Sequence, residues 1–515
     1  MKNWLNDAVV YEIYPQSFYD TNGDGIGDLP GIIQKLDYIS SCGFNVIWLH
    51  PINPSPFRDA GYDVTDFYDV APRYGTLDDY RALCKEAHRR GMKVVFDLVA
   101  GHTSIDHPWF IQSGKVEENE YTNRYIWTVP TFEKGDGVAA LGERDQKCIS
   151  NFFWSQPALN YGYANPDPDH PWEKLPSHPD CVATKNELLR IIDFWIDQGT
   201  DAFRVDMAPS LIKRDKDKSA NTALWHEIRA HVEAKNPECL LISEWGKPDV
   251  AINAGFHLDF LLHDTHPAYT SLFRHEQGRN TTSEFVGDSY FSREGKGDAS
   301  IFLDHFLSNL EATRGKGYIG LITGNHDMPR LGYRRTPEDI KAAMVFLFTM
   351  PGVPFVYYGD EIGMDYITGL PSKEGGYVRT GSRTPMQWSN GKNCGFSDSD
   401  APYLPTDARP DAPTVEAQEQ DEQSLLSLVK ALTAYHRTTP ALWADGEFRL
   451  LLCDYPLVYE RSGEGKTVFV AINPSAEPRE YTVPKLGKVL FSQNVEQDGD
   501  RLLMGGVSFL VAEEL

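Results

Sequence analysis

Short apolar runs alternate with helix-like segments along most of the chain, and some of these runs carry charges where a buried strand should have none. Residues 202–207 are apolar except for Arg204 and Asp206, and they follow a helix-like segment at residues 186–197. That order is typical of a parallel strand after a crossover helix. The period of a strand places Arg204 and Asp206 on one face, where charge is costly unless it is paired or used. We interpret Asp206 as a carboxylate kept ionised by Arg204, with a purely structural ion pair as the alternative.

Three further apolar runs also end in acidic residues or histidines. They cover residues 93–104, 240–245 and 318–327, and their polar residues are Asp97, His102, Glu244, His326 and Asp327. In a (β/α)8 barrel, side chains at the C-terminal ends of the strands meet at one site. The recurrence of this pattern therefore predicts an α/β fold, a (β/α)8 TIM barrel, in which these residues share one site.

The remaining barrel elements are expected from the same alternation. Strands are predicted at residues 8–15, 45–51, 256–262 and 355–363, and helices at residues 31–42, 76–90 and 424–437. Residues 264–316 are expected to be mostly helix and loop, and the Pro- and Asp-rich residues 402–420 an extended connector.

Two segments do not fit the barrel alternation. Residues 102–180 are rich in Trp, Tyr, Pro and Asp, and they are too long for an ordinary barrel loop. From about residue 441 the pattern changes to short alternating strands separated by turns. We therefore predict a catalytic barrel at residues 1–101 and 181–438, an inserted loop domain after strand three at residues 102–180, and a C-terminal all-β domain at residues 439–515.

Acidic and amide side chains alternate with glycines in residues 20–28. Asp20, Asn22, Asp24 and Asp28 offer oxygen ligands at a spacing that suits a hard cation such as Ca2+. The stretch resembles the start of an EF-hand loop without its terminal glutamate. An ordinary polar turn is the alternative.

Composition limits the classes of function. The chain has 515 residues, of which 41% are hydrophobic, enough for a large core and more than one domain. Its net charge of −25 argues against nucleic acid and anionic membrane surfaces as partners. No stretch has the apolar pattern of a signal peptide or a membrane span. Seven scattered cysteines fit a reducing compartment, so we expect a cytoplasmic protein. The oligomeric state stays open.

With these motifs assembled, the chain resembles the α-amylase superfamily of retaining α-glycoside hydrolases, known as family 13. The resemblance is carried by DLVAGHTS, GTDAFRVDM, ISEW and TGNHD, and it continues through GYDVTDF, QPALN, GDEIGM and RTPMQW. It covers nearly the whole chain. The longer motifs are most similar to the branch of oligo-1,6-glucosidases, α-glucosidases and trehalose synthases.

The resemblance implies a role for each of three carboxylates. Asp206 would be the nucleophile, Glu244 the general acid and then the general base, and Asp327 a third carboxylate that grips sugar hydroxyls. The apolar run before Glu244 should raise the pKa of its carboxyl, and Arg204 should lower the pKa of Asp206. A retaining enzyme needs the nucleophile and the acid about 5 Å apart, against about 9 Å in an inverting enzyme.

Further residues of the family's sugar pocket match positions in this chain. The expected sugar-binding residues are Asp59, Tyr62, His102, Arg204, His326 and Arg383. The ring of Tyr62 would offer glucose an apolar stacking face. Arg383 is expected to pair with Asp59 and close the pocket, and Asp97 to orient Arg204.

The resemblance also implies one calcium ion in the loop at residues 20–28, with the Ile26 carbonyl as a further ligand, and no organic cofactor. Gly101 and Ala158 stand where the family usually has Asn and Asp. Neither offers the side-chain oxygen that helps to bind a second calcium ion in α-amylases. Met207 follows the nucleophile, where members active on α-1,6 bonds often have Val and members active on α-1,4 bonds have Thr.

We therefore expect a retaining hydrolase of short α-linked gluco-oligosaccharides that works through a covalent glycosyl-enzyme. A transglucosylase or isomerase such as a trehalose synthase would use the same intermediate but exclude water. An endo-acting α-amylase would need an open cleft and the second calcium ion. A non-catalytic carbohydrate- or partner-binding relative would have lost a carboxylate, and this chain keeps all three. The linkage and the aglycone stay open.

Overall fold

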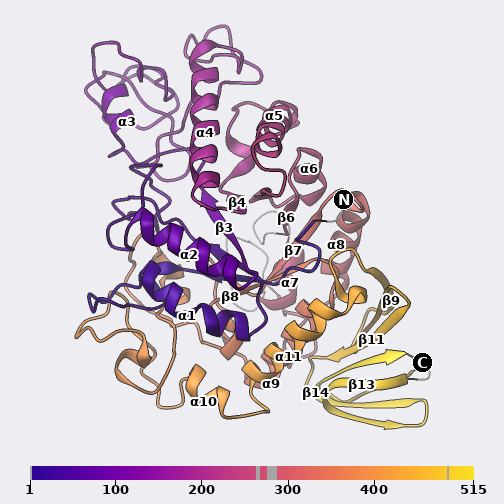
Figure 1. The fold of residues 1–515 in the computed structure, drawn as a ribbon. Helices are drawn as coiled ribbons and strands as arrows, with labels where there is room; N and C mark the ends of the chain where they lie inside the picture. Colours follow the sequence, from indigo (N-terminus) through magenta and orange to yellow (C-terminus); the bar gives the residue numbers. More distant parts are fainter. Residues whose placement is uncertain (1–2, 262–266, 275–286, 484–485, 515) are drawn as a thin grey trace.

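The computed structural model describes residues 3–261, 267–274, 287–483 and 486–514, and eight parallel strands form a closed barrel at its centre (Figure 1). The strands follow one another around the barrel in sequence order, and β8 closes it by pairing with β1. They are β1 (Val10–Ile13), β2 (Val46–Leu49), β3 (Lys93–Leu98), β4 (Ala202–Val205), β5 (Leu240–Ser243), β6 (Leu258–Phe260), β7 (Tyr318–Ile322) and β8 (Val353–Tyr357). The predicted TIM barrel is confirmed.

Helices surround the barrel (Figure 1). The α-helices are α1 (Leu29–Ser41), α2 (Leu77–Arg89), α3 (Pro108–Ser113), α4 (Pro179–Asp197), α5 (Ser219–Lys235), α6 (Pro248–Asn253), α7 (Pro267–Phe273), α8 (Ser300–Thr313), α9 (Pro337–Thr349), α10 (Val415–Glu419) and α11 (Leu425–Thr438). Short 3-10 helices are η1 (Pro15–Ser17), η2 (Ala208–Ser210), η4 (Asp360–Ile362), η5 (Tyr377–Ser382), η6 (Lys392–Gly395) and η7 (Pro440–Leu442). Side chains fix several helix starts: Asp28 caps α1, and Thr76 forms a capping box with Asp79 at α2.

The strands predicted at residues 8–15, 45–51, 256–262 and 355–363 are all shorter in the structure. The strand expected at residues 355–363 ends at Tyr357, because Gly359 adopts a φ of 85° and the chain turns into η4. The strand expected at residues 256–262 is β6, and its predicted last residue, Leu262, lies outside the described residues. Parts of the predicted helix-and-loop stretch, residues 264–266 and 275–286, also lie outside them.

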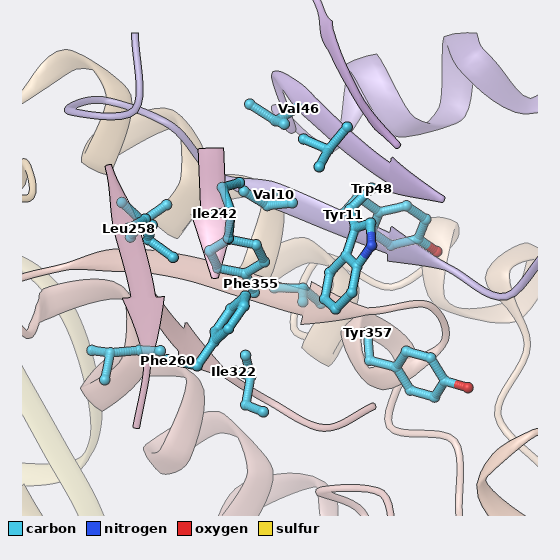
Figure 2. Packing of buried hydrophobic residues seen from close by; sticks show 14 of the residues in the cluster. Val10, Tyr11, Val46, Trp48, Ile242, Leu258, Phe260, Ile322, Phe355 and Tyr357 are labelled. Atoms are coloured by element: carbon cyan, nitrogen blue, oxygen red, sulfur yellow. The ribbon is translucent and has the colours of Figure 1, made fainter. Parts of the chain in front are cut away.

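Aromatic side chains fill the interior of the barrel (Figure 2). Trp48 stacks on Phe260 with ring centroids 5.9 Å apart, and Phe260 meets Phe355 edge-on at 4.9 Å. Gly320 makes room for this layer, because a Cβ there would lie 2.7 Å from Phe260. Trp48 also donates its indole N–H to Asp97 Oδ2 (3.2 Å), so the packed interior directly supports an acid of the predicted site.

Residues 102–180 leave the barrel after β3 and return to it at α4 (Figure 1). A bridge joins His102 to Ala158, and Ala158 is buried against Ile126 and Tyr163. The position where the family usually has an acid is thus part of a small apolar core. The exact bounds of this segment as a domain stay a prediction.

The C-terminal segment forms an antiparallel sheet beside the barrel (Figure 1). Its strands are β9 (Glu447–Leu452), β10 (Leu457–Gly463), β11 (Lys466–Asn473), β12 (Arg479–Thr482), β13 (Leu486–Asp498) and β14 (Arg501–Glu514). They run in the order β12-β14-β11-β10-β9, and β13 also pairs with β14. Val458, Phe469, Leu502 and Leu510 give the sheet an apolar cluster of its own. The predicted C-terminal all-β fold is confirmed.

A search of the described helices finds none with both the length and the apolar character needed to cross a membrane.

Candidate active site

The site is built around the buried guanidinium of Arg204 on β4. Asp97 is the neighbour of Arg204 in the register between β3 and β4, and its Oδ1 lies 2.9 Å from Arg204 Nη1. Asp206 Oδ1 lies 3.3 Å from the same nitrogen, and Glu244 Oε1, just after β5, lies 2.7 Å from Nη2. Three strands thus bring three carboxylates to one cation, as the sequence pattern predicted.

The two carboxyls predicted to do the chemistry are neighbours on one guanidinium, and the nearby Glu244 adds to burial in raising the pKa of Asp206. Met207 adopts a φ of 45° directly after Asp206, and its backbone N–H donates to Glu244 Oε2 (2.9 Å). This left-handed residue turns the chain at the end of β4 and aims the amide at Glu244. Two carboxyls that bind the same guanidinium favour the separation of about 5 Å of a retaining enzyme over the about 9 Å of an inverting enzyme.

One guanidinium does not balance three carboxylates, of which Asp97 and Asp206 are buried. Burial and the neighbouring Glu244 raise the pKa of Asp206 well above its usual value, and Arg204 offsets only part of that shift. The expectation that Arg204 would hold the pKa of Asp206 low is therefore wrong. The side chain of Glu244 is 26% exposed and ion-paired with Arg204, so the apolar surroundings expected for it are not found either. Asp206 therefore keeps its proton to a higher pH than an ordinary aspartate does.

The third carboxylate, Asp327, follows β7 and is held by two arginines. Its Oδ1 lies 2.7 Å from Arg379 Nη1 and 3.2 Å from Arg383 Nη2. The expected pair of Arg383 with Asp59 is not formed, because Arg383 donates to Asp327 and to the carbonyl oxygens of His326 and Glu374.

Asp59 lies close to this cluster but has another partner. It is buried, and Gln156 Nε2 donates to its Oδ2 (2.7 Å). Burial and the nearby negative charge of Asp327 raise the pKa of Asp59 to about 7. Gln156 belongs to the inserted segment, so that segment contacts the predicted site directly.

A chain of hydrogen bonds below the pocket was not foreseen from the sequence. Tyr62 Oη donates to Asp97 Oδ2 (3.0 Å) and lies 3.2 Å from His50 Nδ1, while His50 Nε2 lies 2.7 Å from Glu12 Oε1. Burial raises the pKa of Glu12 and lowers that of His50, which favours the neutral form of both groups. With both groups neutral, the Glu12 hydroxyl donates to His50 Nε2, His50 Nδ1–H donates to Tyr62, and Tyr62 donates to Asp97. Glu12 lies within an apolar run and His50 just after one, which is the signal that identified Asp97 and Glu244.

The two predicted sugar-binding histidines differ in whether a ring nitrogen is left without a hydrogen-bond partner. His102 Nε2 donates to the Tyr62 carbonyl oxygen (3.1 Å), so Nδ1 accepts from the amide of Asn151 (3.2 Å). A hydrogen bond from His102 to a sugar would therefore have to displace one of these partners. The ring of His326 stacks on Tyr62 with centroids 5.2 Å apart, and its Nδ1 has no hydrogen-bond partner among the described residues. Burial lowers the pKa of both rings, to about 4 for His102.

Asn151 occupies the space that a side chain at position 101 would take. A Cβ on Gly101 would lie 2.7 Å from Asn151 Nδ2, so the amide of Asn151 fills the space beside the site. Lys213 Nζ donates to Asn151 Oδ1 (2.9 Å) and to the Ser210 carbonyl oxygen (2.7 Å). This ammonium ties the inserted segment to the barrel.

Two groups of residues offer side chains of the kind that bind metal ions. Glu12, His50 and His326 are the one set of three His, Cys, Asp or Glu residues in the described part of the chain whose ligand atoms lie within 4.8 Å of one another. Both ring nitrogens of His50 take part in the hydrogen-bond chain above, which accounts for this cluster without a metal.

In the predicted calcium loop, Asp20 Oδ1 accepts from the amides of Asn22 and Gly23, and Asp24 Oδ1 accepts from that of Ile26. These turns gather oxygen donors of the kind that a hard cation takes. The three loop carboxylates are not within 4.8 Å of one another as a set, so the loop would have to contract around an ion.

Comparison with known proteins gives the family. Residues 12–445 match the family described as alpha amylase, catalytic domain. The protein is therefore a glycoside hydrolase of the α-amylase family. An oligo-1,6-glucosidase from Heyndrickxia coagulans is 30% identical over 98% of this chain and 98% of its own length. A trehalose synthase/amylase from Mycobacterium tuberculosis is 31% identical over 92% of this chain and 83% of its own length. The crystal structure of an α-glucosyl transfer enzyme covers 100% of both chains with a TM-score of 0.80 and 26% identity.

The hydrogen-bond chain below the pocket generates a first prediction. His50→Leu should lower kcat/KM about tenfold or more, because Tyr62 loses its neighbour and Glu12 is left buried without a partner. The free energy of unfolding should fall by about 1–3 kcal/mol, the cost of an unsatisfied buried group. His50→Asn keeps a donor at the position of Nδ1 and should lose less activity. Steady-state kinetics and urea unfolding of both variants test this, and equal losses in kcat/KM would contradict a role through Tyr62.

A second prediction concerns the pH dependence of sugar binding. The pKa of Asp59 is raised to about 7, so its carboxylate becomes charged only as the pH rises through that value. The charged form accepts stronger hydrogen bonds from sugar hydroxyls. KM should therefore fall between about pH 6 and about pH 8. Asp59→Asn cannot ionise and should show a higher KM without this step. An equal fall in KM with pH in the wild type and in Asp59→Asn would show that another group titrates.

Proposed function

We propose that the protein is a retaining α-glucosidase that removes glucose from short α-linked gluco-oligosaccharides. The observation that carries this proposal is that Asp206 and Glu244 both bind the Arg204 guanidinium. The similarity to an oligo-1,6-glucosidase over nearly the full length of both chains supports the substrate class.

In the first step, Glu244 has to hold the proton that the raised pKa of Asp206 keeps at the site. Glu244 donates this proton to the glycosidic oxygen, and Asp206, then a carboxylate, attacks the anomeric carbon. The bond to the leaving oxygen breaks, the aglycone leaves as an alcohol, and an ester joins glucose to Asp206. Arg204 stabilises the carboxylates as their charges shift.

In the second step, Glu244 accepts a proton from a water molecule whose oxygen attacks the same carbon. The ester bond breaks, Asp206 leaves as a carboxylate, and glucose is released with its α configuration. Asp327, oriented by Arg379 and Arg383, would grip the sugar hydroxyls during both steps. Asp59, Tyr62 and the remaining predicted residues would form the wall around the glucosyl unit.

Transfer of glucose to a second sugar is the alternative, because it needs the same ester and only a different attacking hydroxyl. The likeness to a trehalose synthase/amylase and to an α-glucosyl transfer enzyme supports it. An endo-acting α-amylase is disfavoured, because Gly101 and the buried Ala158 offer no side-chain ligand for a second calcium ion.

Proton NMR of the purified protein with maltose, isomaltose, trehalose and sucrose in separate tubes tests the proposal. Glucose should appear first as the α anomer, and the sugar that is consumed identifies the linkage. Asp206→Ala should reduce turnover at least about 1,000-fold while remaining folded. Appearance of the β anomer first, or near-normal turnover in Asp206→Ala, would refute the mechanism. A new disaccharide with little free glucose would establish the transferase instead.

We also propose that the loop at residues 20–28 binds one calcium ion, with side-chain oxygens from Asp20, Asn22, Asp24 and Asp28 and the Ile26 carbonyl as ligands. The ion would be structural, because Asp28 also caps α1. In addition, we propose a cytoplasmic location and a small oligosaccharide as the partner, since the cysteines are free thiols and the chain carries a net charge of −25.

Calcium binding predicts a shift in thermal stability. At a Ca2+ concentration about 100 times Kd, the free energy of unfolding should rise by about 2.7 kcal/mol, and a chelator should reverse the rise. Asp24→Ala should abolish the response, whereas the exposed Glu422→Ala should retain it. Differential scanning calorimetry with and without chelator measures this. A wild-type Tm that is indifferent to both Ca2+ and chelator would remove the calcium proposal.

A further inference from the structure

A buried acid outside the carboxylate cluster lies beside the predicted general acid, Glu244. Asp259 is the middle residue of β6 and is fully buried. Its neighbour Phe260 packs in the aromatic layer of the barrel interior, so the alternation along a strand turns Asp259 to the outer face of the barrel. Asp259 is therefore not one of the acids that share the Arg204 guanidinium.

The carboxylate of Asp259 accepts hydrogen bonds from both sides of Glu244. Ser243 Oγ, one residue before Glu244, donates to Asp259 Oδ1 (2.6 Å), and the backbone N–H of Trp245, one residue after it, donates to the same oxygen (2.9 Å). The backbone N–H of Lys247 donates to Asp259 Oδ2 (2.9 Å). Ser243 and Asp259 are partners in the parallel register of β5 and β6, which brings the carboxylate within reach of these donors.

Contacts from β4 and its end hold the carboxyl of Glu244 and the chain that enters it. The backbone N–H of Glu244 donates to the Val205 carbonyl oxygen (3.0 Å). Its Oε1 lies 2.7 Å from Arg204 Nη2, and its Oε2 accepts from the backbone N–H of Met207 (2.9 Å). These contacts leave the chain on the other side of Glu244 to be held by something else.

Asp259 holds the chain that leaves Glu244. β5 ends at Ser243, so this chain has left the sheet. Gly246 adopts a φ of 76° and turns the backbone between the two amides that Asp259 binds. Opening this turn would deprive a buried carboxylate of its donors, which is costly. The turn therefore stays closed on Asp259, and the backbone on both sides of Glu244 is fixed.

We propose that Asp259 is a positioning residue for the general acid: by holding the turn after β5, it places the Glu244 carboxyl where it can protonate the leaving oxygen. The inference rests on the proposed function, in which the proton passes from Glu244 to the glycosidic oxygen while the bond from that oxygen to the anomeric carbon breaks. Proton transfer of this kind needs the acid within hydrogen-bond reach of the oxygen. A displacement of about 1 Å can cost about 100-fold in rate.

The kinetic experiment compares two substrates that differ in their need for an acid. The sugar that leaves maltose has to be protonated, whereas fluoride leaves α-glucosyl fluoride as a stable anion. Asp259→Ala should lower kcat/KM about 100-fold with maltose, or with the disaccharide that the enzyme consumes in its place, and at least about tenfold less with α-glucosyl fluoride. Asp206→Ala, which removes the nucleophile, should lose activity on both substrates alike.

A conservative variant gives a second measure of the same role. Asp259→Asn keeps an acceptor oxygen for Ser243 and Trp245 but places an amide N–H2 group opposite the N–H of Lys247, so one of the three bonds is lost. Its loss of kcat/KM should be smaller than that of Asp259→Ala and should again be larger with the disaccharide than with the fluoride. If Asp259→Ala does not fold, this variant decides the question.

Glu361→Gln is the matched control for neutralising a buried acid. Glu361 lies on η4, is fully buried, and accepts hydrogen bonds from the hydroxyls of Tyr11 (2.7 Å) and Tyr38 (2.8 Å). This variant should lower the Tm in calorimetry without changing the ratio of kcat/KM between the two substrates.

Three outcomes are separated in this way. If the Asp259 variants lower the Tm but keep the wild-type ratio of kcat/KM between the disaccharide and the fluoride, Asp259 is structural only and the proposal is wrong. Unchanged kinetics in both variants would also overturn it. Failure of the wild type to release glucose from α-glucosyl fluoride and from each disaccharide would instead count against the proposed function.

Discussion

The site depends on the buried guanidinium of Arg204. It lies within 3.3 Å of three carboxylates, and removing it would leave the buried Asp97 and Asp206 and the partly exposed Glu244 without a counter-charge. Breaking a buried ion pair on one side is among the most destabilising changes a core can suffer. The planar fork of the guanidinium also fixes the directions from which the acids approach. The separation of nucleophile and acid is therefore set by Arg204 and by the strand register, rather than by flexible loops.

The surroundings of Arg204 keep its charge available to those three acids. Glu12 is also buried in the barrel, and as a carboxylate it would compete for the same cation. Burial raises its pKa instead, and the neutral chain through His50 and Tyr62 delivers only a hydrogen bond to Asp97. Trp48 supplies a second hydrogen bond to Asp97 from the aromatic layer below. The barrel core thus orients the acid behind Arg204 without adding charge to the cluster.

Features that depend on local pattern were predictable from the sequence, and features that depend on loop paths were not. The barrel strands and the acids at their ends follow from periodicity, and the (β/α)8 fold makes those ends converge. Glu12 and His50 carry the same signal and could have been found. The partners Asn151, Gln156 and Arg379 lie in irregular segments, where neither period nor spacing indicates which side chain will be reached.

The same limit explains the corrected partner of Arg383, the corrected pKa direction of Asp206 and the unforeseen partners of His102. The sequence places Arg383 near the site but does not show whether it reaches Asp59 or Asp327, because that depends on the turn through η5. It places Asp206 beside Arg204 but does not show how many other acids share that guanidinium. The direction of the Asp206 pKa is a property of the whole cluster, so a neighbouring residue alone is a poor guide to it. Likewise, the two ring nitrogens of His102 are hydrogen-bonded to Tyr62 and Asn151. The contact with Asn151 is possible because Gly101 has no side chain there.

In the proposed mechanism, chemistry and selectivity come from different parts of the molecule. The strands supply Arg204, Asp206 and Glu244, and these groups would treat water and a sugar hydroxyl alike, because each would lose one proton to Glu244 as it attacks. Discrimination between them then has to come from groups that hold the competing sugar in place and keep water away. Residues 151–156 and 374–383 carry the partners of His102, Asp59 and Asp327, so these two segments are where we expect such groups to lie.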